Sequence, residues 1–455
     1  MSELAEYAQR IESLAQRLGL DYYPVDFELA PASLMTEIAV YGLPVRMPHW
    51  SFGVRYIHQL VRQSMGHSKI FEVMFPGDPC RAFLMDSNST AENALVTAHV
   101  LGHADFAKNN QLFARFHAMA GGNIVETAAA HARRIQLAIE AHGVERVEQV
   151  LDAALALESH IDVAGELHRA RYAEFVADKE KPVHSAFQKR FQQLPGEAPA
   201  APPEGPHSGP VRARVPPHPE YDLLWFIANY APELEQWERD IFLMVRCESF
   251  YFYPVFACQI MNEGWASYWH ARLLREADFL PQPLYLSAIK AHSDVVRPFA
   301  SDQQAALAIN PYHLGFTLWE RIVDKHGLER AREVRREEDD FGFVRNWLDE
   351  ELAEEAGLFV YETRPGDEIR VASKDINAIR EAILAPKFNF GAPRVAAVEL
   401  KQDGSLVLAH DHASDGRGLD VNRAKRVLDY VRRVWRRPVR LDTVNDRGEA
   451  LELAA

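Results

Sequence analysis

The stretch Asn262-Glu263-Gly-Trp-Ala-Ser-Tyr-Trp-His270 sets a carboxylate and an imidazole at the two sides of an apolar, aromatic run. Far upstream, His99-Val-Leu-Gly-His103 places two imidazoles four residues apart. If both stretches are helical, each presents its polar groups on one face. Three or four such groups meeting between helices would form a metal site with nitrogen and oxygen ligands, suited to zinc, iron or manganese.

Glu263 is the residue in these stretches that most needs a partner. Its neighbours in sequence are mainly apolar, and burying an unpaired carboxylate costs several kcal/mol or forces its protonation. Such a group needs a cation, an arginine or a metal. Gly264 would allow a neighbouring helix to approach closely. The alternative to a metal is a buried ion pair with Arg246 or Arg239.

We predict that His99, His103 and Glu263 are metal ligands. His270 lies two helical turns after Glu263 and is predicted to be a fourth ligand or a partner that holds one in place. The alternative for the two histidines of the upstream stretch is ordinary hydrogen bonding on a partly buried helix. Zinc is the metal that this donor set favours first, with iron or manganese as the other options.

The sequence contains the predicted metal ligands but lacks the usual general base of a zincin. A helical His-x-x-x-His pair is the ligand half of the zincin motif, in which a glutamate beside the first histidine is the general base. Val100 stands at that position here. Asp105, which could also hold a ligating histidine, and Glu248, in the aromatic-rich stretch before Tyr251, are the candidates for proton transfer. Glu248 is also a candidate for a further ligand.

Composition narrows the class of protein. The chain has 455 residues and a formal net charge of −15, whereas a nucleic-acid-binding protein would show a basic face. Three cysteines cannot supply a disulfide framework. We find no signal-peptide pattern at the N-terminus and no run of apolar residues long enough to span a membrane. These features predict a cytoplasmic protein with no membrane span.

The pattern of residues predicts a mainly α fold, with a large helical main domain over residues 1–385. Ser89-Thr-Ala-Glu92 is a capping box that should begin the helix carrying the histidine pair. Residues 195–219 hold nine prolines and are predicted to be a linker or loop. Residues 386–455 should form a small α+β module of order β-β-α-β, with strands at 395–400, 405–410 and 439–444 and a turn at Asp403-Gly404.

Together these motifs resemble the SpoVR family, named for a stage V sporulation protein, over nearly the whole chain. The stretches that carry the resemblance are His49-Trp50-Ser-Phe-Gly53, Ala98–Asn110, Leu151-Asp152, His160-Ile-Asp162, Asp222–Leu224, Glu235–Ile241, Met261–His270, His292-Ser293, Asn310-Pro311-Tyr312, Phe343–Asn346, Leu406–His410 and Val434–Arg440. The resemblance implies a link to spore cortex formation, although similar proteins occur in bacteria that never sporulate.

A second similarity is to zinc peptidases of the gluzincin type. Some of these enzymes place their third metal ligand in a Glu-Gly-Trp-Ala-x-Tyr stretch like Glu263–Tyr268. This similarity implies zincin-like core helices, but Val100 departs from the peptide-cleaving mechanism.

The leading functional hypothesis is therefore a metal-dependent hydrolase that acts on a peptide or a cell-wall precursor. Two alternatives stay open. Two histidines and a carboxylate also suit a non-haem iron enzyme. A non-enzymatic regulatory or scaffold protein that keeps a degenerate zincin core is the other, and it would have protein partners. The sequence identifies neither the small molecule or peptide that would bind nor the oligomeric state.

Overall fold

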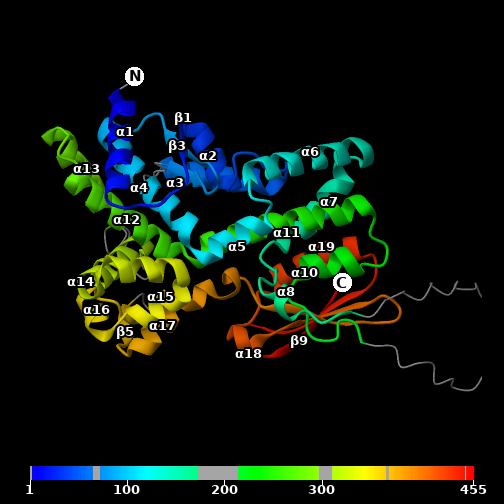
Figure 1. Cartoon of the computed structure of the whole chain (residues 1–455). Helices are drawn as coiled ribbons and strands as arrows, with labels where there is room; N and C mark the ends of the chain where they lie inside the picture. Colours follow the sequence, from blue (N-terminus) through cyan, green and yellow to red (C-terminus); the bar gives the residue numbers. More distant parts are fainter. Residues whose placement is uncertain (1–2, 65–71, 173–213, 297–309, 365–367, 446) are drawn as a thin grey trace, which may run out of the picture. The chain divides into compact units, whose positions relative to one another are not determined.

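The computed structural model describes residues 3–64, 72–172, 214–296, 310–364, 368–445 and 447–455. The chain forms two compact units, each made from two segments of the sequence: residues 1–147 with 246–392, and residues 148–245 with 393–455. The contacts thus divide the chain differently from the expected boundary at 385/386, because residues 148–245 join the C-terminal module. The first unit contains all of the predicted metal ligands. Figure 1 gives the labels of the elements.

Three helices pack together at the centre of the first unit: α4 (Thr90–Asn109), α12 (Gln259–Glu276) and α14 (Pro311–Glu337). Helix α4 is buried on every side, and between Ala91 and Ala107 only Glu92 is not buried. The predicted capping box is confirmed: the Ser89 side chain accepts a hydrogen bond from the Glu92 N–H, and the Glu92 carboxylate accepts one from the Ser89 N–H.

These helices cross at glycines, which lets their backbones touch. A Cβ on Gly102 of α4 would lie 2.7 Å from the Cα of Ala266 in α12, and a Cβ on Gly264 would lie 2.2 Å from the carbonyl carbon of Gly315 in α14. No side chain fits at either crossing. Gly102 precedes His103, so the close approach of α4 to α12 brings the predicted ligands to that interface. Gly264 follows Glu263 and brings α12 against α14. The predicted close helix contact at Gly264 is confirmed.

A three-stranded sheet lies against α4 and supplies one more polar side chain. Its order is β1 (Val25–Ala30), β3 (Cys80–Met85) and β2 (Glu72–Phe75), with β1 parallel and β2 antiparallel to β3. Strand β2 is an edge strand that begins with Glu72. The sequence predicts short strands at Ile70–Met74 and Ala82–Met85, which correspond to β2 and β3, but it predicts no strand at β1.

The remaining elements of the first unit surround this core. They are α1 (Glu3–Arg17), α2 (Ala32–Tyr41), α3 (Trp50–Ser64), α5 (Gln111–Met119), α6 (Ile124–His142), α13 (Gln282–Val295), α15 (Asp340–Trp347), α16 (Glu350–Glu355), the hairpin β4 (Val360–Arg364) and β5 (Glu368–Ser373), α17 (Ile376–Leu384) and the 3₁₀ segment η2 (Ala385–Gly391). Helices α7 (Val144–Ala156) and α11 (Gln236–Ala257) span the division between units in sequence.

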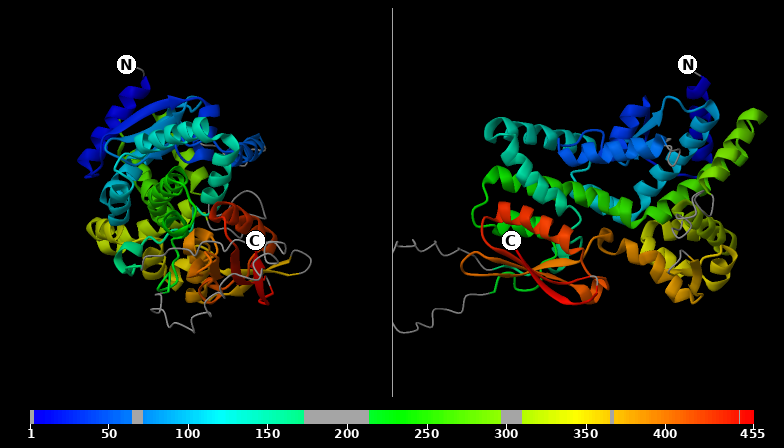
Figure 2. Two further views of the ribbon diagram at one scale, coloured as in Figure 1. Left: turned by 90° about the vertical axis from the view of Figure 1, so that its right-hand side faces the viewer. Right: turned by 180° about the vertical axis from the view of Figure 1, so that it is seen from behind.

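The second unit contains a four-stranded sheet of order β6-β7-β8-β9, formed by β6 (Val395–Leu400), β7 (Leu406–His410), β8 (Val439–Val444) and β9 (Ala450–Ala454). Helix α19 (Val421–Trp435), drawn in red in Figure 2, lies over the sheet. The predicted β-β-α-β order is confirmed, and β9 extends it.

Residues before the C-terminal module complete this second unit. Glu220 and Ala397 exchange two backbone hydrogen bonds, and the ring of Phe226 stacks on Trp435 at a centroid distance of 6.0 Å. Phe226 belongs to α10 (Leu223–Tyr230); the short helices α8 (Gly165–His168) and α18 (His412–Asp415) belong to the same unit. Of the predicted proline-rich segment, residues 195–213 lie outside the described residues.

One predicted helix boundary is wrong. Because proline favours the first turn of a helix, the sequence predicts that Pro254 begins a new helix. Pro254 instead lies inside α11, which ends at Ala257, and α12 begins at Gln259. The sequence also predicts two separate helices near 312–325 and 328–338, and this is confirmed: α14 is broken at Gly327, whose φ of +83° and ψ of 164° are not helical.

Within the described residues, no single helix has the length and hydropathy of a membrane span. The bent pair α11 and α12, with 59° between its halves, passes the same test only when the two helices are counted together.

Candidate metal centre

His99, His103 and Glu263 lie together between α4 and α12. Each offers one donor atom, and the three atoms lie within 4.8 Å of one another. The Oε2 atom of Glu263 is 3.6 Å from Nε2 of His99 and 3.5 Å from Nε2 of His103. That Oε2 atom is buried and has no hydrogen-bond partner among the described residues. The structure therefore brings the three predicted ligands together. Among the described residues, the Glu263 carboxylate lies at ion-pair distance from the two histidines rather than from its alternative partners, Arg246 and Arg239.

The remaining ring nitrogens of the two imidazoles are held by neighbours on α12. His103 Nδ1 lies 2.9 Å from the amide oxygen of Asn262, which can only accept, so Nδ1 carries the proton. His99 Nδ1 lies 2.9 Å from Nδ1 of His270. In the tautomer that leaves the His99 Nε2 lone pair facing Glu263, His99 donates this hydrogen bond.

His270 completes a row of three imidazoles. Its Nε2 lies 2.5 Å from Nδ1 of His292 on α13. If His99 donates to Nδ1 of His270, then Nε2 of His270 carries the proton and donates to His292. Both ring nitrogens of His270 are thus engaged. His270 therefore lies within hydrogen-bond distance of His99 and His292, an arrangement that suits the predicted role of a partner holding a ligand in place.

Burial and the neighbouring charges set the protonation of the trio. Burial, followed by the charge of His103, lowers the pKa of His99 to about 4, so His99 is neutral at pH 7. Burial opposes protonation of His103 as well, but the combined effects of Glu263, Asn262 and Glu72 outweigh it and raise the pKa of His103. Burial alone would raise the pKa of Glu263, yet the two imidazoles lower it overall. Glu263 is therefore an anion, the form in which a carboxylate binds a cation.

Glu72 is a fourth polar group at this point, and the sequence analysis missed it. Its Oε1 atom lies 3.9 Å from Nε2 of His99. Burial raises the pKa of Glu72 to about 7, against the opposing effect of His103. The side chains of Glu72 and Glu263 keep 19% and 21% of their surface exposed, whereas His99 keeps 4%. A small molecule would therefore reach the trio from the side of the two carboxylates.

Tyr312, at the start of α14, is the other group that sequence reasoning gave no role. The negative charge of Glu263, followed by burial, raises the pKa of Tyr312 well above its ordinary value. The ring of Tyr312 stacks on His99 at a centroid distance of 6.2 Å. Tyr312 and His292 both lie in stretches that carry the family resemblance; Glu72 gave only the weak signal of a lone carboxylate in an apolar strand.

Val100 is fully buried in the apolar core. The position beside the first histidine, where zincins carry their general base, thus offers no titratable group here.

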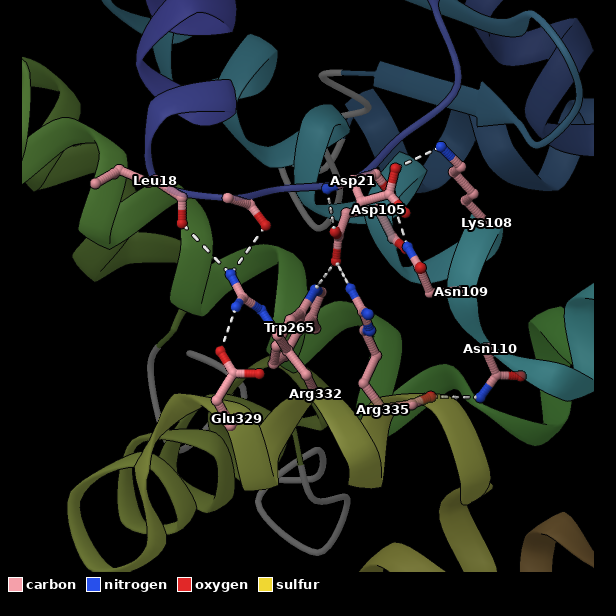
Figure 3. Close-up of polar contacts among 11 residues, drawn as sticks. Leu18, Asp21, Asp105, Lys108, Asn109, Asn110, Trp265, Glu329, Arg332 and Arg335 are labelled. Atoms are coloured by element: carbon pink, nitrogen blue, oxygen red, sulfur yellow. Dashed lines mark hydrogen bonds and ion pairs between the residues drawn. The ribbon is translucent and has the colours of Figure 1, made fainter.

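The two carboxylates predicted for proton transfer lie elsewhere. Glu248 is fully buried; its Oε2 accepts a hydrogen bond from Arg46 at 2.9 Å, and Oε1 lies 3.1 Å from Nδ1 of His131. Asp105 accepts hydrogen bonds from the backbone N–H of Asp21 at 2.8 Å and from the indole of Trp265 at 2.7 Å, and it pairs with Arg335 (Figure 3). Each carboxylate is held by donors outside the trio, because burial obliges an ionised carboxylate to find them.

This geometry predicts a structural role for Asp105. An Asp105→Asn variant should lose about 3–5 kcal/mol of unfolding free energy, because it leaves the buried guanidinium of Arg335 without its anion. Urea unfolding measures the change. The control is Arg330→Ala, which removes an exposed pair with Glu333 and should cost about 1 kcal/mol or less. An Asp105→Asn protein of full stability that no longer bound metal would restore Asp105 to the functional site.

The fold and this cluster define a mainly helical protein with a candidate metal centre between its core helices. A model of the family described as SpoVR like protein matches residues 1–391, and a model of the SpoVR-like C-terminal domain matches residues 394–446. The chain belongs to the SpoVR family, and the resemblance drawn from its motifs is confirmed.

One curated relative is the uncharacterized protein YcgB of Escherichia coli (strain K12). It is 28% identical over an alignment of 485 residues, which covers 97% of this chain and 92% of the relative. No solved structure matches the chain.

Proposed function

We propose that His99, His103 and Glu263 bind a divalent metal ion. The observation that carries this proposal is the buried, unpartnered Oε2 of Glu263, 3.5 and 3.6 Å from two imidazole nitrogens. These distances exceed those of ordinary hydrogen bonds. Donor atoms that bind one zinc ion tetrahedrally at 2.0–2.1 Å lie about 3.4 Å apart. The spacing therefore supports a shared ion over a His–Glu ion pair.

The residues around the trio support the same proposal. Metal-ligating histidines usually donate their second ring N–H to a neighbouring acceptor, which fixes the nitrogen that faces the ion. Asn262 accepts from His103, and His270 can accept from His99. Both hydrogen bonds use Nδ1 and leave Nε2 of each histidine available to bind the metal. Two imidazoles with a carboxylate suit zinc, and they also suit iron or manganese.

The function that this site supports best is metal-dependent hydrolysis. A divalent ion held by the trio would supply Lewis acidity, which polarises a carbonyl and makes water more acidic. We assign the proton-accepting role to Glu72, which approaches His99 from strand β2 and faces the exposed side of the trio. Tyr312, whose ring stacks on His99, lines the same site. A peptide or a cell-wall precursor is the proposed substrate class, in line with the association of the family with spore cortex formation.

A second candidate function is a non-enzymatic regulator that keeps the ligands of a zincin-type core. The burial of Val100 in place of the zincin glutamate favours it. The two functions differ in the role of Glu72, which accepts a proton in the hydrolase and has no catalytic role in the regulator.

The test compares wild type, His103→Ala and Glu72→Gln, each supplied with zinc, manganese or iron(II). Amine release from a panel of peptides and cell-wall fragments is measured beside metal content. We expect His103→Ala to lose metal and turnover together. Glu72→Gln should keep its metal and lose about 10²–10⁴-fold in turnover, the usual effect of removing a proton acceptor.

Three outcomes would count against this proposal. Unchanged turnover in Glu72→Gln removes Glu72 from the mechanism. Wild type that binds metal but hydrolyses nothing favours the regulatory function, and an oxygen-dependent spectral change of the iron-loaded protein favours a non-haem iron enzyme.

A further inference from the structure

His292 stands at the far end of the row of imidazoles that begins at the candidate metal centre. In this row, Nδ1 of His99 lies 2.9 Å from Nδ1 of His270, and Nε2 of His270 lies 2.5 Å from Nδ1 of His292. His292 belongs to α13, which packs against α4 and α12 (Figure 1). Its ring is held edge-on against Phe316 of α14, at a centroid distance of 5.3 Å. The row therefore connects the trio to a helix that supplies none of the three ligands.

A row of neutral imidazoles has only two consistent arrangements of its protons. A neutral imidazole carries a proton on one nitrogen and accepts a hydrogen bond at the other. Each of the two contacts needs one donor and one acceptor. A charged His270 would donate at both nitrogens, but the residue is fully buried, which strongly disfavours a cation. The protons of the three rings therefore all point along the row in one direction or in the other.

The two directions differ at the metal centre. In the outward direction, His99 donates from Nδ1, His270 donates from Nε2, and Nδ1 of His292 accepts. The Nε2 lone pair of His99 then faces Glu263 and can bind a cation. In the inward direction, His292 donates from Nδ1 and His270 donates from Nδ1 to His99. The proton of His99 then lies on Nε2, which is 3.6 Å from the Glu263 carboxylate, and a protonated nitrogen cannot bind a metal ion.

We propose that His292 is a positioning residue for the metal ligand His99 and that it acts through His270. By accepting from Nε2 of His270, His292 stabilises the outward direction, in which Nε2 of His99 is available to the ion. Without an ion, the Glu263 carboxylate favours a proton on that nitrogen, and therefore the inward direction. Metal binding thus moves the proton of His292 from Nδ1 to Nε2. This proposal rests on the proposed metal centre.

The test titrates the full-length chain with zinc in competition with a chromophoric chelator. His292→Phe keeps a ring against Phe316 but offers no acceptor. The outward direction would then leave the buried N–H of His270 unsatisfied, whereas in the inward direction that nitrogen carries no proton. His292→Asn keeps an acceptor oxygen near the position of Nδ1. The control is His117→Phe on α5, because Nε2 of His117 is buried with no hydrogen-bond partner among the described residues.

We expect His292→Phe to bind zinc about tenfold more weakly than wild type, which is at the low end of the usual effect of removing a group that orients a metal ligand. His292→Asn and His117→Phe should bind zinc nearly as wild type does. Nitrogen NMR of histidine-labelled wild type provides a second measurement, which a merely structural role would not change: added zinc should move the proton of His292 from Nδ1 to Nε2.

Three results would overturn this proposal while the metal centre stands: zinc binding by His292→Phe as tight as that of wild type, binding by His292→Asn as weak as that of His292→Phe, or an equal loss in His117→Phe. An identical His292 tautomer with and without zinc would also overturn it. Wild type that binds no zinc would overturn the metal centre and this proposal together.

Discussion

A Glu263→Gln variant is expected to bind zinc roughly a hundredfold more weakly than wild type while keeping its fold. The binding free energy of a four-ligand zinc site is about 10–16 kcal/mol, so an anionic ligand supplies about 3 kcal/mol, which is about a hundredfold in affinity. Glutamine has nearly the same shape as glutamate. It therefore leaves the helix packing intact while removing the charge that binds the cation. Competition with a chromophoric chelator measures the affinity.

The control for this variant lies on the same helix. Glu276, at the end of α12, forms an exposed pair with Arg272, and Glu276→Gln should bind zinc as wild type does. If the two variants bind zinc equally tightly, Glu263 is not a ligand and the proposed centre fails.

A Gly264→Ala variant should be among the most destabilised single substitutions in this chain. The new Cβ would lie 2.2 Å from the carbonyl carbon of Gly315 and 2.4 Å from its Cα, and both are backbone atoms. Helices α12 and α14 would have to separate, at a cost of about 3 kcal/mol or more. Glu263 and Tyr312 would move apart with them, so the folded remainder should also bind zinc weakly. Urea unfolding and the same chelator competition measure both effects.

Gly53→Ala is the matched control. A Cβ at Gly53 meets nothing within 4 Å, and the residue is inside α3. Alanine there should stabilise the protein by about 0.5–1 kcal/mol, because it restricts the unfolded chain. A Gly264→Ala protein as stable as Gly53→Ala would show that the helices do not cross at these glycines.

Local signals in the sequence predicted much of this protein. Hydrogen bonds between Ser89 and Glu92 define the start of α4. Because both residues belong to one short motif, the sequence was enough to predict this helix start. The strands and helix of the C-terminal module followed from the same kind of short-range pattern. The trio of His99, His103 and Glu263 was predictable because a buried carboxylate and paired imidazoles each need a partner.

What the sequence could not supply depends on long-range packing. Glu72 reaches His99 only because β2 pairs with β3 and the sheet lies against α4. Asp105 and Glu248 were predicted to be catalytic groups because the sequence indicates a buried carboxylate but does not identify the cation that neutralises it. For Asp105 that cation is Arg335, which lies 230 residues further along the chain. For the same reason the grouping of residues 148–245 with the C-terminal module was not predicted, because it depends on contacts such as Phe226 on Trp435.

The most direct test of the metal centre is the metal content of the full-length chain, purified without a histidine tag and analysed by elemental analysis with X-ray absorption. The proposed centre predicts about one zinc, iron or manganese ion per chain, bound by two imidazoles and oxygen ligands. Protein that contains negligible metal after exposure to all three, and is as stable as before, would contradict it. So would an ion bound through sulfur.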